Sequence, residues 1–260
     1  MAIATRMIEV RNLSKVYNTR SGEDVEAFTG LTLHVRPGEF VSVVGPSGCG
    51  KTTLLKILAG LIPKTDGEAY VAGSPIEGPR RDIGVVFQTP VLLPWRTALE
   101  NTLLPVQVQK LDRTEYTRRA HELIRLVGLE GFENKYPSEL SGGMQQRNAI
   151  TRALIYDPAV LLMDEPFGAL DAMTRETMNE ELLRIWGDSQ KTIFFITHSI
   201  PEAVFLSDRV LVMSHRPGRI VEVVEVDLPR PRSLSVMGSA RFAELTAHIR
   251  DLFHLQGGVD

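Results

Sequence analysis

The segment 45–53 reads GPSGCGKTT, a composition that suits the binding of phosphate groups. Four of its positions fit the pattern G-x-x-x-x-G-K-S/T: Gly45, Gly50, Lys51 and Thr52. In that pattern, loop N–H groups and the positive end of a following helix surround phosphate oxygens, the lysine neutralises charge and the threonine ligates Mg²⁺. An ordinary glycine turn is the alternative. The nucleotide-binding interpretation assigns a role to the whole loop: Gly45, Pro46, Ser47, Gly48, Cys49, Gly50, Lys51, Thr52 and Thr53.

The residues on either side of this loop predict the strand and the helix that the pattern needs. Glu39–Val44 (EFVSVV) is short, β-branched and apolar, as expected of a buried strand. From Thr52 onward, apolar residues recur at helical spacing, at Leu54, Leu55, Leu58 and Leu61. Gly60 and Pro63 then predict the end of that helix.

A second apolar segment, Ala159–Glu165 (AVLLMDE), ends in two carboxylates. A strand parallel to the one before the phosphate loop would bring both carboxylates to the edge of the nucleotide. Because successive side chains on a strand point to opposite faces, Asp164 and Glu165 need different roles. We expect Asp164 to hold the Mg²⁺ shell and Glu165 to orient and deprotonate an attacking water. A solvated acidic loop after a core strand is the alternative.

A third motif, Leu140–Arg147 (LSGGMQQR), places two glycines at the start of a predicted helix. Ser141 is suited to cap that helix, and its exposed N-terminus would be a second place for an anion. Taken alone, the motif fits a capped turn equally well.

Composition and length restrict the class of protein. The chain has 260 residues, of which 43% are hydrophobic and 23% charged, as in a soluble globular protein. The longest stretch without an acidic or basic residue, Ile83–Trp95, is too short to span a bilayer, and the N-terminus MAIATRMIEVRN lacks an apolar leader. The single cysteine suits a reducing cytosol. A net charge of −3 with only short basic clusters argues against a nucleic-acid partner.

The order of predicted elements indicates one α/β domain with an insertion. Strand-like segments dominate from Ile8 to about Phe87, helical periodicity dominates residues 89–157, and strands alternate with helices after that. We therefore expect a nucleotide-binding core over about 1–88 and 158–230, an inserted helical part over about 89–157, and a linker with a helix over about 231–260.

The ordered set GPSGCGKT, LSGGMQQR and VLLMDE resembles the ATP-binding subunit of an ABC transporter. The resemblance covers nearly the whole chain. It implies an α/β fold with a phosphate-loop (RecA-like) NTPase core, an N-terminal antiparallel β subdomain and an inserted α-helical subdomain. It also implies ATP and Mg²⁺ as ligands, with Thr52, Gln88 and Asp164 around the metal.

The resemblance assigns roles to residues that stand alone in the sequence. Gln88, at the end of DIGVVFQ, is similar to the glutamine that reaches Mg²⁺ and the attacking water, and His198 to the histidine that contacts the γ-phosphate. Asp171, in Ala169–Asp171, matches the D-loop. Tyr17 is similar to the aromatic residue that stacks on adenine, although a tyrosine after a strand is also common in cores and on surfaces.

The resemblance further implies that two copies of the chain enclose ATP between them. The signature residues of one copy would cover the nucleotide held by the other: Ser141, Gly142, Gly143 and Gln145. The implied assembly is a homodimer bound to integral membrane permease subunits, and indirectly to an extracytoplasmic solute-binding protein, on the cytoplasmic face of the membrane. The form M-Q-Q-R, with VFQTPVLLPWRTALENTLLP and SHRPGRI, resembles importers of nitrate, taurine and alkanesulfonates.

Two other functions stay open at this point: a soluble ABC ATPase with a non-transport partner, and a phosphate-loop kinase. Two segments also have two interpretations each. Thr89–Arg96 (TPVLLPWR) either exposes an apolar patch for a membrane partner or fills the seam between subdomains. Cys49 is either a thiolate favoured by the lysine and the helix N-terminus or a small buried filler.

Overall fold

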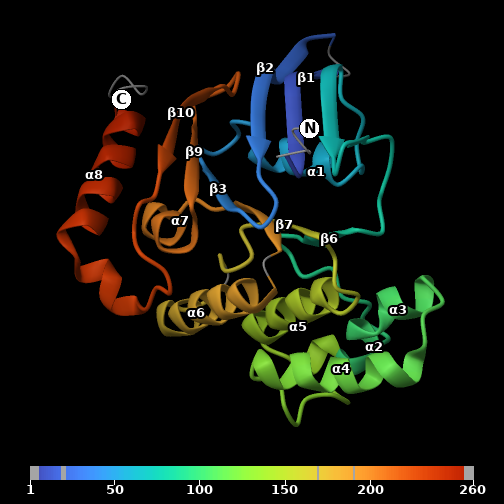
Figure 1. Cartoon of the computed structure of the whole chain (residues 1–260). Coiled ribbons are helices and arrows are strands. Elements are labelled where there is room, and N and C mark those ends of the chain that lie inside the picture. The colour runs from blue at the N-terminus through green and yellow to red at the C-terminus, as the bar shows by residue number, and fades with distance from the viewer. Residues whose placement is uncertain (1–5, 19–21, 169, 190, 255–260) are drawn as a thin grey trace, which may run out of the picture.

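The computed structural model describes residues 6–18, 22–168, 170–189 and 191–254. Within them the chain forms two β-sheets and a group of helices at one side (Figure 1). The first sheet is antiparallel, in the order β2-β1-β4-β5. Its strands are β1 (Ile8–Asn18), β2 (Asp24–Val35), β4 (Asp66–Val71) and β5 (Ser74–Pro75).

The second sheet has six strands in the order β10-β9-β3-β8-β7-β6. All neighbours are parallel except β10 and β9. The strands are β3 (Phe40–Val44), β6 (Ile83–Val86), β7 (Val160–Asp164), β8 (Thr192–Ile196), β9 (Arg209–Met213) and β10 (Ile220–Glu225). Every residue of β3, β7, β8 and β9 is buried, which explains their uninterrupted apolar sequences, since parallel strands are covered on both faces.

Two hydrophobic cores cover the two faces of this sheet. On one face, α1 (Lys51–Leu58) packs through Leu54, Leu55 and Leu58 between the parallel sheet and the antiparallel one. The other face is covered by side chains from α5 (Gly142–Leu154), α6 (Ala172–Ser189), α7 (Ile200–Leu206) and α8 (Ala240–His254). The α/β fold with an antiparallel β subdomain is thus confirmed.

The remaining helices lie together below β6 in Figure 1. They are α2 (Ala98–Thr102), α3 (Leu104–Val108) and α4 (Arg113–Leu126), which pack near α5 in a small core of their own. Two short 3-10 helices complete the described elements: η1 (Pro137–Glu139) before α5 and η2 (Leu234–Gly238) before α8.

The helix after the phosphate loop is shorter than the leucine spacing predicts. Gly60 adopts a left-handed φ of 70°, and the N–H groups of Gly60 and Leu61 donate to Ile57 O and Lys56 O, both at 2.9 Å. These bonds close the helix end in the way a C-terminal glycine commonly does. The helix therefore ends at the glycine that was predicted to end it, and Leu61 lies beyond that end, 46% exposed.

Candidate functional site

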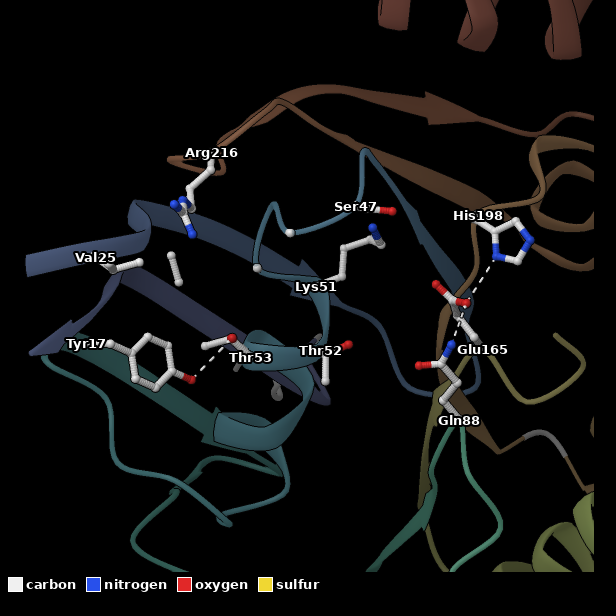
Figure 2. Close-up of a pocket in the computed structure, with 13 residues that line it drawn as sticks. Tyr17, Val25, Ser47, Lys51, Thr52, Thr53, Gln88, Glu165, His198 and Arg216 are labelled. Atoms are coloured by element: carbon white, nitrogen blue, oxygen red, sulfur yellow. Dashed lines mark hydrogen bonds and ion pairs between the residues drawn. The ribbon is translucent and has the colours of Figure 1, made fainter. Parts of the chain in front are cut away.

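A cavity of about 400 Å³ opens at the carboxyl end of β3, where the phosphate loop lies between the two sheets. Figure 2 shows that its walls come from distant parts of the chain. They are the first two strands, the phosphate loop with α1, the ends of β6, β7 and β8, and the β9–β10 connection. The lining residues are Tyr17, Val25, Ala27, Ser47, Gly48, Gly50, Lys51, Thr52, Thr53, Gln88, Glu165, His198 and Arg216.

The glycines of the phosphate loop are needed for two different reasons. Gly48 and Gly50 have left-handed φ values of 77° and 101°, which residues with a Cβ rarely adopt. A Cβ on Gly50 would also lie 2.8 Å from a ring carbon of Phe28, and one on Gly45 would lie 3.0 Å from Met213 Cβ. The tight packing of the loop against its own sheets, and not only the approach of a ligand, therefore excludes side chains here.

The loop holds Lys51 at the inner end of the cavity, with only 7% of the residue exposed. Its Nζ donates to Gly45 O at 2.7 Å and to Pro46 O at 2.9 Å. The ammonium group is thus fixed over the loop that was predicted to surround phosphate. Thr52, on the first turn of α1, donates from Oγ1 to Asp164 Oδ1 at 3.1 Å.

The two carboxylates at the end of β7 have different surroundings, as predicted from their adjacency. Asp164 is 3% exposed, and burial raises the pKa of its carboxyl, while the hydrogen bond from Thr52 acts in the opposite direction. Glu165 leaves the strand with a left-handed φ of 45°, a conformation that costs about 1–2 kcal/mol for a residue with a side chain. Its N–H donates to Ile196 O at 2.8 Å, which holds that turn against β8.

The Glu165 carboxylate joins the two residues that the family resemblance singled out. Its Oε2 accepts a hydrogen bond from Gln88 Nε2 at 3.3 Å and lies 3.1 Å from His198 Nδ1 (Figure 2). Gln88 follows β6, Glu165 follows β7 and His198 follows β8. Three neighbouring strands therefore deliver a carboxylate, an amide and an imidazole to one wall of the cavity, opposite Lys51.

A buried glutamate in α7 supports the turn that carries the histidine. Glu202 is 6% exposed and accepts a hydrogen bond from the Thr197 hydroxyl, whose oxygen in turn accepts from Ser199 N at 3.0 Å. Burial raises the pKa of the Glu202 carboxyl. This residue could not be identified from the sequence, because a glutamate in the first turn of a helix ordinarily faces solvent.

Tyr17 lies at the other end of the cavity, where its hydroxyl is 3.3 Å from Thr53 Oγ1. The tyrosine is 40% exposed, and Lys15 Nζ lies 5.0 Å from the centre of its ring. An exposed ring on the cavity rim is available for stacking on a flat ligand. Tyr17 is thus a surface residue of the cavity and not a core residue.

Cys49 does not have the chemistry that its neighbours suggested. The residue is fully buried, it does not line the cavity, and burial raises the pKa of its thiol more than the nearby Lys51 lowers it. Of the two interpretations of Cys49, the small buried filler fits the structure better than the thiolate. Gly45 and Pro46 also lie outside the lining of the cavity, although both supply carbonyl groups to Lys51.

We expect Cys49 to react with a disulfide reagent such as DTNB at pH 8 at least about tenfold more slowly in the native protein than after unfolding in guanidinium chloride. A raised pKa leaves less thiolate at that pH, and burial excludes the reagent. Because the chain has one cysteine, Cys49→Ser gives the blank for the absorbance assay. Equal rates in the two states would show that the thiol is accessible.

The LSGGMQQR motif forms the start of α5, away from this cavity. Ser141 is the N-cap and accepts a hydrogen bond from Met144 N at 3.2 Å. Gln145 turns back to donate to Pro137 O at 2.9 Å and Leu140 O at 3.2 Å, so its amide nitrogen holds η1. None of the predicted signature residues lines the cavity of its own chain: Ser141, Gly142, Gly143 and Gln145.

Asp171, the predicted D-loop residue, lies directly before α6. Its Oδ1 accepts a hydrogen bond from Thr174 N at 3.0 Å, and this bonding lowers the pKa of the Asp171 carboxyl. Asp171 likewise lies outside the cavity lining. Ala169 of the same motif is outside the described residues.

Two further residues of the site were not identified from the sequence. Gln146 is 1% exposed, and its Nε2 donates to Phe87 O at 3.0 Å, directly before Gln88. Its Oε1 has no hydrogen-bond partner among the described residues. Arg216 enters the cavity from the β9–β10 connection. Gln146 and Arg216 both belong to segments that were quoted for the family resemblance, LSGGMQQR and SHRPGRI, but neither segment by itself gave these two residues a role.

Oxygen donors suitable for Mg²⁺ meet where Thr52 contacts Asp164. Among the described residues, no group of three or more His, Cys, Asp or Glu side chains is arranged to hold a metal ion alone. That set fits Mg²⁺, which commonly takes one or two carboxylates and completes its shell with water and substrate phosphates. In the described part of the chain, no helix combines the length and apolar character needed to cross a bilayer.

Comparison with known proteins agrees with this site. A family model described as "ABC transporter" matches residues 28–168. The chain is 46% identical to the taurine import ATP-binding protein TauB of Rhizobium johnstonii over 95% of this chain and 97% of TauB. It is 42% identical to the aliphatic sulfonates import ATP-binding protein SsuB of Bacillus cereus over 96% of this chain and 97% of SsuB.

Solved structures give the same result. A dimeric structure of the ATP-binding cassette MJ0796 bound to ADP and Pi is similar to this chain with a TM-score of 0.78 and 34% sequence identity. The similarity covers 86% of this chain and all of the MJ0796 chain. Together with the matched family model and the nearly full-length relatives, this places the protein by sequence and by fold: the chain belongs to the ABC transporter family.

Proposed function

We propose that this chain is the ATP-hydrolysing subunit of an importer for a small solute, and that it couples hydrolysis to a membrane permease. One observation carries the proposal: a phosphate loop, a carboxylate, an amide and an imidazole converge on one cavity from separate strands. Production of ADP and phosphate from ATP by the purified chain tests whether the chain hydrolyses ATP. Transfer of the phosphoryl group to a small acceptor, and not to water, would instead indicate a kinase.

In this proposal the phosphate loop binds the β- and γ-phosphates and Lys51 neutralises their charge. The bonds from Lys51 to Gly45 O and Pro46 O place the ammonium over the loop. Tyr17 stacks on the adenine at the other end of the cavity. Thr52, Asp164 and Gln88 would hold Mg²⁺, which when bound neutralises charge on the phosphate oxygens.

Glu165 acts as the general base for the attacking water, and Gln88 and His198 hold its carboxylate. The two contacts to Oε2 restrict the carboxylate to one orientation toward the cavity. Such positioning matters because a base must lie within hydrogen-bonding reach of the proton it removes. His198, with 62% of its side chain exposed, is also free to contact the γ-phosphate.

The second copy of the chain supplies the remaining wall of the site. Because the start of α5 lies outside the cavity of its own chain, an anion site at Ser141–Gly143 serves a nucleotide only across an interface. The dimeric MJ0796 structure, which is similar over 86% of this chain, supports such an assembly. In this proposal Asp171, directly before α6, would contribute to the same interface as the D-loop residue.

The permease would dock beside Thr89–Arg96 on the cytoplasmic face of the membrane. The backbone of this stretch is held by the buried Asn101 amide, which accepts from Leu93 N at 2.8 Å and donates to Leu93 O at 3.1 Å. Val91 and Trp95 remain 57% and 69% exposed, whereas Leu92 and Leu93 are half-buried. A fixed backbone with exposed apolar side chains suits the docking of a partner helix.

Trp95 also borders a groove of about 580 Å³. Apolar side chains and basic groups share its walls, among them Leu103, Val106, Leu111, Arg96, Lys110 and Arg113. We assign the apolar face of a cytoplasmic permease helix to this groove. The names of the relatives TauB and SsuB support taurine and sulfonates as the solute class. An extracytoplasmic binding protein that delivers the solute is part of the proposal.

The Trp95→Asp variant is expected to lose ATP-driven uptake of taurine or an alkanesulfonate by at least about tenfold in vesicles that contain the permease. ATP hydrolysis by the isolated subunit should stay within about twofold of the original rate, since a 69% exposed side chain contributes little to folding. Co-purification with the permease gives a second measurement of the same contact.

Val221→Asp is the matched control, because Val221 is also an exposed apolar residue (43%) but lies on β10, far along the chain from this groove. It should preserve both uptake and co-purification. If Trp95→Asp retains full uptake, the permease docks elsewhere; if it aggregates, Trp95 contributes to the core.

A further inference from the structure

The connection between β9 and β10 brings a basic side chain to the nucleotide cavity. Residues 214–219 form this connection, and Arg216 is the part of it that lines the cavity. In Figure 2 the guanidinium group lies at the same end of the cavity as Tyr17 and Val25, away from Glu165 and His198. It approaches from the hairpin side, whereas Tyr17 approaches from β1.

Hydrogen bonds within the β9–β10 connection hold the backbone on both sides of Arg216. The Ser214 hydroxyl donates to His215 O at 2.9 Å and accepts from Arg219 N at 3.0 Å. The Ser214 N–H also donates to Arg219 O at 2.9 Å. Because these bonds close the hairpin on both sides of Arg216, the residue has a defined place over the cavity although its side chain is exposed.

The same connection is attached to both walls of the cavity. Gly218 N donates to Ala27 O at 2.9 Å on β2, and a Cβ on Gly218 would lie only 2.1 Å from Cys49 O in the phosphate loop. The hairpin therefore packs directly on the phosphate loop and on the strand that carries Val25. The position of Arg216 is set relative to the nucleotide site itself.

The guanidinium group of Arg216 makes no hydrogen bond or ion pair with any described residue. Guanidinium groups are planar, carry five N–H donors and stack well on aromatic faces. The phosphate-binding part of the cavity already has the ammonium of Lys51. A donor-only, planar group at the Tyr17 end is instead suited to a base or a ribose, which offer acceptors and a flat face.

We propose that Arg216 binds the nucleoside end of ATP, holding the base and ribose from the hairpin side while Tyr17 holds them from β1. The inference rests on the proposed function and extends it by a further binding residue. Arg216 would raise affinity for the nucleoside part without contacting the terminal phosphates. It would thus favour whole nucleotides over inorganic polyphosphate.

The test compares two probes that differ in the nucleoside alone: ATP and inorganic tripolyphosphate, both measured by calorimetry on the full chain. Arg216→Ala should weaken ATP binding about 5- to 30-fold, the range expected for loss of a stacked or hydrogen-bonded guanidinium. Tripolyphosphate binding should change by less than about twofold. Arg216→Lys should recover only part of the ATP affinity, because an ammonium group cannot stack as a plane.

Arg219→Ala is the matched control, since Arg219 is an exposed arginine of the same hairpin that does not line the cavity. It should bind both probes like the original chain. Thermal unfolding of all variants without ligand checks that the hairpin is intact.

Three results would overturn the proposal. Unchanged ATP affinity in Arg216→Ala would mean that the guanidinium does not touch the nucleotide. An equal loss for ATP and tripolyphosphate would identify a phosphate contact, and an equal loss in Arg219→Ala would identify a general effect of charge. Failure of the original chain to bind ATP at all would instead contradict the proposed function.

Discussion

Glutamine in place of Glu165 is expected to slow ATP hydrolysis about 10²- to 10⁴-fold while ATP still binds. The amide has the shape of the carboxylate and can keep a contact to Gln88, but it cannot take a proton from water. Lys51, the loop glycines and Tyr17 are untouched by the change, so affinity should stay near that of the original chain. Phosphate release under saturating ATP and equilibrium binding of ATP are the two measurements.

Two further variants distinguish a defect in hydrolysis from a defect in ATP binding. Glu176→Gln removes an exposed carboxylate from α6 and should hydrolyse ATP at the original rate. Lys51→Ala should instead weaken ATP binding, because it removes the ammonium group that Gly45 O and Pro46 O hold over the loop. Turnover of Glu165→Gln near the original rate would remove Glu165 from the role of base and leave it as a positioning group.

If two chains share each ATP site, then dimerisation should depend on ATP and on the residues at the start of α5. The Glu165→Gln protein with Mg·ATP should sediment as a dimer, since bound nucleotide stays intact between the copies. Adding Ser141→Arg should abolish that dimer. The arginine would remove the N-cap of α5 and place a bulky side chain where the partner's nucleotide would lie.

The loss of the cap by itself lowers helix stability by about 1 kcal/mol, so a second substitution at this position is informative. Ser141→Ala removes the cap without the bulk and should weaken the dimer less than Ser141→Arg does. Ser74→Arg, an exposed serine on β5, should leave the dimer intact. An ATP-bound dimer of the Ser141→Arg double variant, detected by sedimentation velocity, would contradict the shared site.

The buried strands could be predicted from the sequence because each is a short, unbroken apolar segment. Glu39–Val44 and Ala159–Glu165 were expected as parallel strands, and the structure confirms both: β3 starts one residue later, and β7 is one residue shorter at each end. The phosphate loop between β3 and α1 followed from glycine spacing. In each case the residues of one short segment are sufficient to predict its structure, without knowledge of distant contacts.

Other features depend on contacts between distant segments. The burial of Cys49 follows from the core in which strands of both sheets pack with α1, and no local pattern indicates that core. The left-handed turn at Glu165 arises because β8 accepts its N–H at Ile196, and the sequence placed this residue on the strand. The role of Arg216 was not predicted for the same reason. This residue is distant in sequence from the other residues that line the cavity, and the fold alone brings it there.

The hydrogen bond between Gln146 and Phe87 O makes α5 dependent on the residues before Gln88. If the end of β6 shifts when Gln88 meets a ligand, α5 either moves with it or leaves a buried amide and carbonyl unpaired, at about 1–3 kcal/mol for each group. Movement of the whole helix is the less unfavourable response. Through this one side chain, a ligand bound in the cavity would also move the N-terminus of α5, which lies outside that cavity.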